Sequence, residues 1–187
     1  LFSLPLGLLV CVGRMSRLKP LSVLLRFYIS IMRGTPLMLQ LLVVYFGPYY
    51  LFGIQISMAY RFYAVIIAFS INYAAYFAEI YRGGFQSIPR GQKEAAHVLG
   101  YSRTQTFASI LIPQMFRRVL PSITNEVITL VKDTSLAFAI AYAEMFTIAK
   151  QLASAQASVE PYLVAGLFYY IFNFVVAFIM EKMEASV

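Results

Sequence analysis

The sequence predicts an all-α membrane protein with about five transmembrane helices. Three observations predict it: the composition, the length of the apolar runs and the residues that end them. Of the 187 residues, 60% are hydrophobic and only 12% are charged, whereas soluble domains carry about 25% charged residues. Several uncharged stretches approach the roughly 20 residues that a membrane-spanning helix needs. The remaining polar sequence is too short for a soluble domain, so residues 1–187 are expected to form a single membrane domain.

The opening run, LFSLPLGLLVCVG, is apolar but stops after 13 residues, at Arg14. It is too short to span a bilayer, and it has neither the charged start nor the small-residue cleavage site of a signal peptide. We therefore expect a truncated first helix whose beginning lies upstream of Leu1. Cys11, the single cysteine, has no partner for an internal disulfide.

Four further apolar stretches are expected to cross the membrane, at residues 36–56, 62–78, 119–149 and 162–180. The stretch 62–78 ends at Glu79. The stretch 119–149 is the longest and is broken by Lys132, Asp133 and Glu144. Helix edges read from a sequence are uncertain by several residues.

The basic residues choose the orientation, because Lys and Arg in short loops favour the cytoplasmic side. They gather after the first stretch and between the third and the fourth: Arg14, Arg17, Lys19, Arg26, Arg82, Arg90, Lys93, Arg103, Arg117 and Arg118. The opposite loops hold only Arg61 and Lys150. The segment 82–118 and the C-terminus are therefore predicted to be cytoplasmic. The net charge of +7 reflects this topology, and no basic, aromatic-interleaved soluble face points to nucleic acid.

Within the segment 82–118, residues 90–113 are unusually polar for this chain and predict two short helices. The first contains QKEAAHVL and ends at Gly100, since glycine tolerates the left-handed conformation that ends helices. Ser102 and Gln105 form a capping box for the second, and Pro113 marks where it bends or ends. Ala95, Val98 and Leu99 share one face of the first helix, where small side chains allow another protein to approach. Local physics alone fits a solvated loop with two surface helices equally well.

The order of these residues resembles the EAA loop of ABC-importer permeases, whose coupling helices dock into an ATPase subunit. Glu-Ala-Ala, three residues, Gly, nine residues and Ile-x-Leu-Pro is the family pattern. The residues that match it, and to which the resemblance gives the docking role, are Glu94, Ala95, Ala96, Gly100, Ile110 and Pro113. Ile112 stands where the pattern has Leu, which preserves the apolar character.

Other stretches resemble the polar amino acid uptake family within these permeases: MRGTPLMLQ, NYAAYFAEIYRGGFQSIPRGQ and VKDTSLAFAI, in family order. The resemblance covers essentially the whole chain. It implies a permease that moves a polar amino acid across a bacterial inner membrane, with cytoplasmic ABC ATPase subunits, a second permease subunit and an extracytoplasmic amino-acid-binding protein as partners. Which amino acid is carried, and whether the pore is a homodimer or a heterodimer, stays open.

The stretch KDTSL, residues 132–136, places charges within an apolar run, and such residues are functional candidates by default. Lys132, Asp133, Thr134 and Ser135 are therefore candidates for the substrate pathway. The last three are good N-cap residues, so a half-helix that starts here would present free N–H groups to a substrate carboxylate. The alternative is an ion pair at the membrane boundary.

Gly34 and Thr35, followed by Pro36, complete the candidate pathway because they weaken regular helix and expose backbone carbonyls. Arg33 would either anchor the end of a span or contact substrate. Glu79 and Arg82 would pair with each other, and Glu144 would line the outer mouth or lie in an external loop.

Several kinds of chemistry are not encoded. The chain has no phosphate-binding loop of the G-x-x-x-x-G-K-[ST] type, so it is expected to bind no ATP or other cofactor itself. His97 is the only histidine and has no neighbouring ligands for a metal. The alternatives to a permease are a secondary transporter, which usually has inverted repeats and more spans, and a membrane receptor or assembly subunit that transports nothing.

Overall fold

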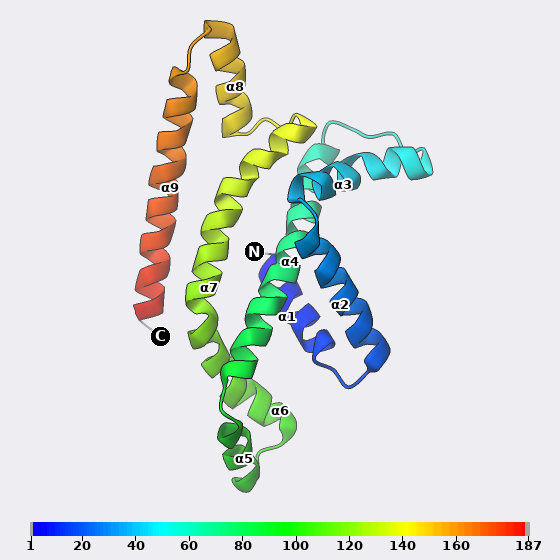
Figure 1. Cartoon of the computed structure of the whole chain (residues 1–187), viewed down its shortest axis with the longest axis vertical. Coiled ribbons are helices and arrows are strands. Elements are labelled where there is room, and N and C mark those ends of the chain that lie inside the picture. Colours follow the sequence, from blue (N-terminus) through cyan, green and yellow to red (C-terminus); the bar gives the residue numbers. More distant parts are fainter. Residues whose placement is uncertain (1, 186–187) are drawn as a thin grey trace.

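The computed structural model describes residues 2–185, and its regular elements in that range are all helices. Figure 1 shows them as long rods with a small knob, formed by residues 90–105, at the lower end in that view. In chain order they are α1 (Ser3–Arg14), α2 (Lys19–Gly34), α3 (Leu37–Phe52), α4 (Tyr60–Ser87), α5 (Arg90–Val98), α6 (Arg103–Gln105), η1 (Thr106–Leu111), α7 (Ile112–Asp133), η2 (Thr134–Ile140), α8 (Met145–Gln156) and α9 (Glu160–Ala185).

The core lies around α4, which packs against α1, α2, α3 and α7. Its buried side chains are mainly alanine and aromatic residues, and Phe77 and Tyr81 are almost fully enclosed. Small residues let helices approach closely, which is how membrane helices associate without a hydrophobic driving force between them. By contrast, α9 packs mainly along α7 and α8 and leaves most of its apolar surface exposed.

The predicted spans appear with different edges. Within residues 2–185, α4 and α9 are each long and apolar enough to cross a membrane. Two bent pairs also qualify, α2 with α3 at 109° and the helix Arg103–Ile140 with α8 at 57°, which gives up to four spans. The 12-residue α1 is the short apolar first helix that the sequence predicts.

The prediction of a simple span at 36–56 was wrong, because it omits α2. The sequence placed Lys19 and Arg26 among the basic residues that follow the first stretch, yet residues 19–34 form a 16-residue amphipathic helix. Pro20 lies in its first turn, where proline is tolerated. The chain then breaks at Gly34 and Thr35 and continues as α3.

Of the two outcomes predicted at Pro113, a bend or an end of the helix, the structure excludes the end. The helix that Ser102 caps does not end there: it runs through the π-helical η1 into α7, so that Arg103–Ile140 is continuous. Pro113 comes two residues after the π-helical η1, where the regular hydrogen-bond ladder of the helix is already interrupted. The second short helix of the polar segment is thus the start of a membrane helix, which links the knob to the core.

Candidate functional site

The break between α2 and α3 is held by side-chain hydrogen bonds. Thr35 is extended, with φ −122° and ψ 147°, and Pro36 precedes the first residue of α3. Gln40 donates to the carbonyl oxygen of Met32 at 2.9 Å and to that of Thr35 at 3.1 Å. The sequence predicts carbonyls exposed to a cavity, but these two are satisfied by Gln40, because an unpaired backbone oxygen in a membrane is costly.

Asn72 on α4 ties this break to the core. Its Nδ2 donates to Gln40 Oε1 at 2.9 Å and to the carbonyl oxygen of Met32 at 3.2 Å. Asn72 is only 4% exposed, and buried amides are normally hydrogen-bonded in this way. The position of the α2–α3 break is therefore fixed against α4.

Asp133, the last residue of α7, faces the same region from the other side. Its Oδ2 accepts a hydrogen bond of 2.7 Å from the hydroxyl of Tyr73, the neighbour of Asn72 on α4. Lys132 points elsewhere because successive helical residues face apart, and it is exposed with no ion pair recorded within residues 2–185. The neighbouring ion pair considered from the sequence is therefore not formed.

The predicted helix start at Asp133 was wrong. The chain continues from α7 into the 3₁₀ helix η2, and the hydroxyls of Thr134 and Ser135 donate back to the carbonyls of Val131 and Lys132 at 2.6 and 2.8 Å. The break comes later, at Ala141, whose φ is 52°. Glu144 then caps α8 by accepting from the N–H groups of Phe146 and Thr147.

These elements enclose a polar cavity of about 360 Å³ between the α2–α3 break, α4 and α7. It brings Thr35 and Asp133, two of the sequence-predicted residues, into one site. The other four predicted pathway residues do not line it: Gly34, Lys132, Thr134 and Ser135. The lining consists of Thr35, Pro36, Leu37, Asn72, Tyr73, Tyr76, Glu126, Thr129, Asp133 and Leu136.

Glu126 is the site residue that the sequence reasoning missed. It lies seven residues before Asp133 on α7, two helical turns away and hence on the same face. Its carboxylate has no recorded hydrogen bond or ion pair in the described part of the chain. The signal was present: Glu126 interrupts the apolar run 119–149 just as Asp133 does, and the i, i+7 spacing joins them.

A second candidate site is the knob formed by α5 and the start of the Arg103–Ile140 helix (Figure 1). Gly100 adopts φ +77°, as the sequence predicts for the residue that ends α5. Ser102 and Gln105 form the predicted capping box, with hydrogen bonds of 3.2 and 2.9 Å.

The exposed surface of the knob agrees only in part with the docking residues that the family pattern implies. Ala96 is 1% exposed, because it packs inside the knob, so it cannot contact another protein directly. Val98 and Leu99 are 86% and 74% exposed, and these two large apolar side chains give the knob its apolar surface. Of the other matched residues, Glu94, Ala95 and Pro113 are exposed, and Ile110 is half-buried in η1.

Among residues 2–185, no group of three or more His, Cys, Asp or Glu side chains is placed to hold a metal ion. The polar cavity instead offers carboxylates, phenols and hydroxyls. This set suits a small molecule that carries ammonium and hydrogen-bonding groups.

Comparison with known proteins identifies the family of this chain. Residues 3–187 match the family model described as binding-protein-dependent transport system inner membrane component. The arginine transport system permease protein ArtQ of Bacillus subtilis is 38% identical over 185 residues, which cover 98% of this chain and 83% of that protein. The octopine transport system permease protein OccM of Rhizobium radiobacter is 41% identical over 193 residues, with 98% and 79% covered.

Solved structures agree in fold. A crystal structure of an amino acid ABC transporter with histidines superposes with a TM-score of 0.89 at 32% identity and covers 100% of this chain and 86% of that one. An inward-facing structure of the MetNI methionine ABC transporter gives a TM-score of 0.78 at 19% identity, covering 98% and 85%. The second likeness concerns the fold alone.

Proposed function

This chain belongs to the binding-protein-dependent transport system inner membrane components, and on that premise we propose how its residues carry the cargo and meet the motor. It is the multi-pass inner-membrane permease subunit of an ABC importer for polar amino acids. It is not an enzyme and carries no cofactor, since a partner ATPase binds the ATP. A binding protein is its other partner by membership of this family.

The polar cavity is the proposed substrate site, and one observation carries the proposal: Glu126 and Asp133 face the α2–α3 break from the same side of α7. Intramembrane carboxylates are expensive and mark transport pathways. An amino acid brings an ammonium group that these carboxylates attract. The hydroxyls of Thr35 and Thr129 and the ring of Tyr76 offer contacts for the rest of the molecule.

The pair of carboxylates also favours one class of cargo. A neutral amino acid has a single cationic group, whereas an amino acid with a cationic side chain has two. Two carboxylates in one cavity of about 360 Å³ repel each other when neither is neutralised. We therefore expect amino acids with cationic side chains to be preferred over neutral ones.

The segment 82–118 is the proposed cytoplasmic coupling loop, with α5 as the helix that docks into the ATPase. Val98 and Leu99 supply exposed apolar surface, and Glu94 and Ala95 lie on the same short helix. Because the helix capped by Ser102 continues into α7, a displacement of the knob reaches Glu126 and Asp133 along one continuous helix. This continuity is a physical route from ATP hydrolysis to the cavity.

The remaining partners are a second permease subunit, identical or not, an amino-acid-binding protein on the extracytoplasmic side, and membrane lipid. The exposed apolar surface of α9 and α8 supports an environment of lipid or a neighbouring permease. The binding protein would deliver its amino acid at the end opposite the knob.

The test is uptake into vesicles that contain the permease with its ATPase and binding protein. Glu126→Gln should lower the uptake of arginine relative to glutamine about tenfold, since a lost charge-assisted contact is worth roughly 1.5 kcal/mol. Glu181→Gln, an exposed position near the end of α9, is the charge-matched control. An unchanged ratio in Glu126→Gln would exclude Glu126 from substrate selection, and no ATP-dependent uptake of any amino acid would refute the transport assignment.

A further inference from the structure

A second polar cavity, of about 500 Å³, lies next to the first and nearer to the knob. The two cavities share Tyr76, and Gly34 in one is followed by Thr35 in the other. The proposed transport pathway does not use the remaining polar residues of this second cavity. They are Arg14, Arg26, Ser30, Arg33 and Glu79, with Ile29 as the apolar member.

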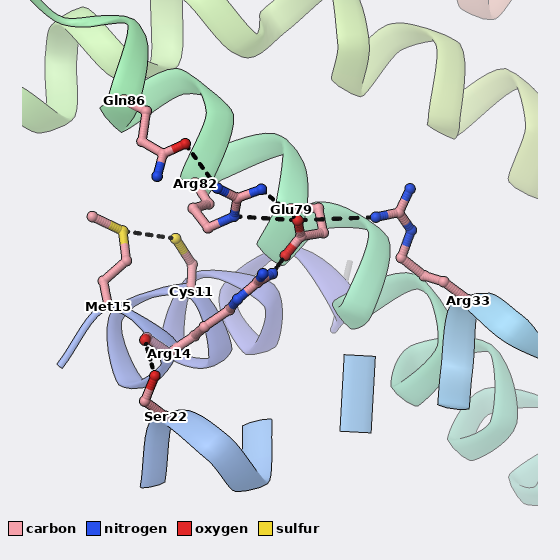
Figure 2. A network of polar contacts seen from close by, with 8 residues as sticks. All are labelled: Cys11, Arg14, Met15, Ser22, Arg33, Glu79, Arg82 and Gln86. Carbon is pink, nitrogen blue, oxygen red and sulfur yellow. Dashed lines mark hydrogen bonds and ion pairs between the residues drawn. The ribbon is translucent and has the colours of Figure 1, made fainter. Parts of the chain in front are cut away.

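Glu79 on α4 is the centre of this cavity. Figure 2 shows arginines from three helices pointing at its carboxylate: Arg14 from α1, Arg33 from α2 and Arg82 from α4 itself. The sequence predicted only the Glu79–Arg82 pair, which is present with Arg82 Nη2 2.8 Å from Glu79 Oε2. Arg82 Nη1 also donates a hydrogen bond of 2.7 Å to Gln86 Oε1.

The charges in this cavity do not balance. Arg14, Arg26 and Arg33 line it and Arg82 lies beside it, and within residues 2–185 Glu79 is the one carboxylate that forms an ion pair with any of them. Arg33 Nη1 is 3.9 Å from Glu79 Oε2, too far for a hydrogen bond, and lies over the ring of Tyr76. Arg26 has no recorded polar partner within residues 2–185. Two guanidinium groups thus retain unused donors.

Those two groups lie on one face of α2. Arg26, Ser30 and Arg33 are spaced by four and three residues, so their side chains are neighbours on the helix surface. Guanidinium groups match the geometry of phosphate oxygens, to which they donate in pairs. A phosphate between Arg26 and Arg33 would accept hydrogen bonds from the guanidinium N–H groups that Glu79 does not engage.

An exposed apolar face of the same helix lies beside this basic face. Val23, Leu24 and Phe27 of α2 are each more than 60% exposed. A free phosphate would use only the arginines, whereas a molecule with an anionic head and apolar chains would contact both faces of α2. The two faces together favour an amphiphile.

We infer that this cavity binds the phosphate-bearing headgroup of an anionic membrane lipid, with its acyl chains along Val23, Leu24 and Phe27. The inference is independent of the cargo, but it rests on the proposed cytoplasmic position of the knob, because that side of the inner membrane attracts clustered Lys and Arg to anionic lipids. The bound headgroup balances the surplus charge and joins α1, α2 and α4.

The test is lipid retention by the assembled transporter, measured by native mass spectrometry after addition of phosphatidylglycerol and phosphatidylcholine in equal amounts. The wild-type protein should retain phosphatidylglycerol preferentially. Replacing both Arg26→Gln and Arg33→Gln should weaken that retention on the order of 30-fold, since each basic residue near an anionic lipid contributes about fivefold. The double variant Arg17→Gln and Lys19→Gln removes the same charge outside the cavity and should retain the lipid.

Three results would overturn the inference: equal retention of both lipids by the wild type, equal loss in both double variants, and complete displacement of phosphatidylglycerol by excess inorganic phosphate. The last would assign the site to a free anion. The wild-type comparison does not depend on whether the Arg26→Gln and Arg33→Gln variant assembles. Lipid retention is read without substrate, so failure here leaves the proposed amino acid path untouched.

Discussion

The hydroxyl of Tyr73 on α4 donates a hydrogen bond of 2.7 Å to Oδ2 of Asp133, which lies 60 residues later at the end of α7. Both residues line the polar cavity, and the bond holds the Asp133 carboxylate against α4, the most buried helix in the described part of the protein. One oxygen of Asp133 therefore accepts this bond, and the other, which has no recorded partner within residues 2–185, is available to a substrate ammonium group.

Asp133→Asn should lower amino acid uptake roughly 5- to 150-fold, because it removes a charged partner worth about 1–3 kcal/mol. Thr134→Ala should have the smaller effect, since the Thr134 hydroxyl donates to the carbonyl of Val131. The measurement is concentration-dependent uptake in reconstituted vesicles, with basal ATP hydrolysis as the control for assembly. A wild-type uptake curve in Asp133→Asn would remove this residue from the pathway.

Gly84 and Gly83 should differ sharply when each is changed to alanine. A Cβ at Gly84 would clash with Val119 and lie 2.9 Å from Met115 Cγ, whereas a Cβ at Gly83 meets nothing within 4 Å. Gly84→Ala should thus destabilise the α4–α7 packing by about 1–3 kcal/mol. Gly83→Ala should be neutral or stabilise by about 0.5–1 kcal/mol. Thermal unfolding of the solubilised protein compares them, and equal unfolding temperatures would contradict this account of the packing.

Gly100→Val should uncouple the permease from its motor. Gly100 ends α5 at φ +77°, a conformation that costs a β-branched residue about 1–2 kcal/mol, so the knob would lose its shape. Uptake and transport-stimulated ATP hydrolysis should fall together while the chain still inserts. Gly100→Asn is the matched control, because asparagine tolerates this conformation. Normal stimulated hydrolysis in Gly100→Val would exclude the coupling role.

The orientation can be tested by cysteine labelling in a Cys11→Ala background, which removes the single native thiol. Gln92→Cys, in the exposed α5, should react only with reagents that enter the cytoplasm, since the basic residues of 82–118 hold that segment inside. Ser57→Cys, before α4, should react from outside. The reverse pattern would overturn the orientation and with it the docking role.

The class of protein and several local features of the chain could be predicted from the sequence. The low charge content required a membrane fold, and the Glu94-to-Pro113 pattern indicated the permease family, which the comparisons confirm. Gly100 and the Ser102–Gln105 capping box formed as predicted. Such features depend on neighbouring residues, whose backbone preferences act wherever the chain lies in space.

Which side chains face one another depends on the tertiary structure. It paired Asp133 with Tyr73 and closed the carbonyls of the α2–α3 break with Gln40. It also buried Ala96, a residue of the family pattern, inside the knob. The Tyr73–Asp133 bond joins helices 60 residues apart, and the closure of the break and the burial of Ala96 depend on how neighbouring segments fold back on one another. Hydrophobic periodicity fixes which residues share a face, but the packing around α4 fixes which faces meet, and a buried polar group must then take whichever partner that packing provides.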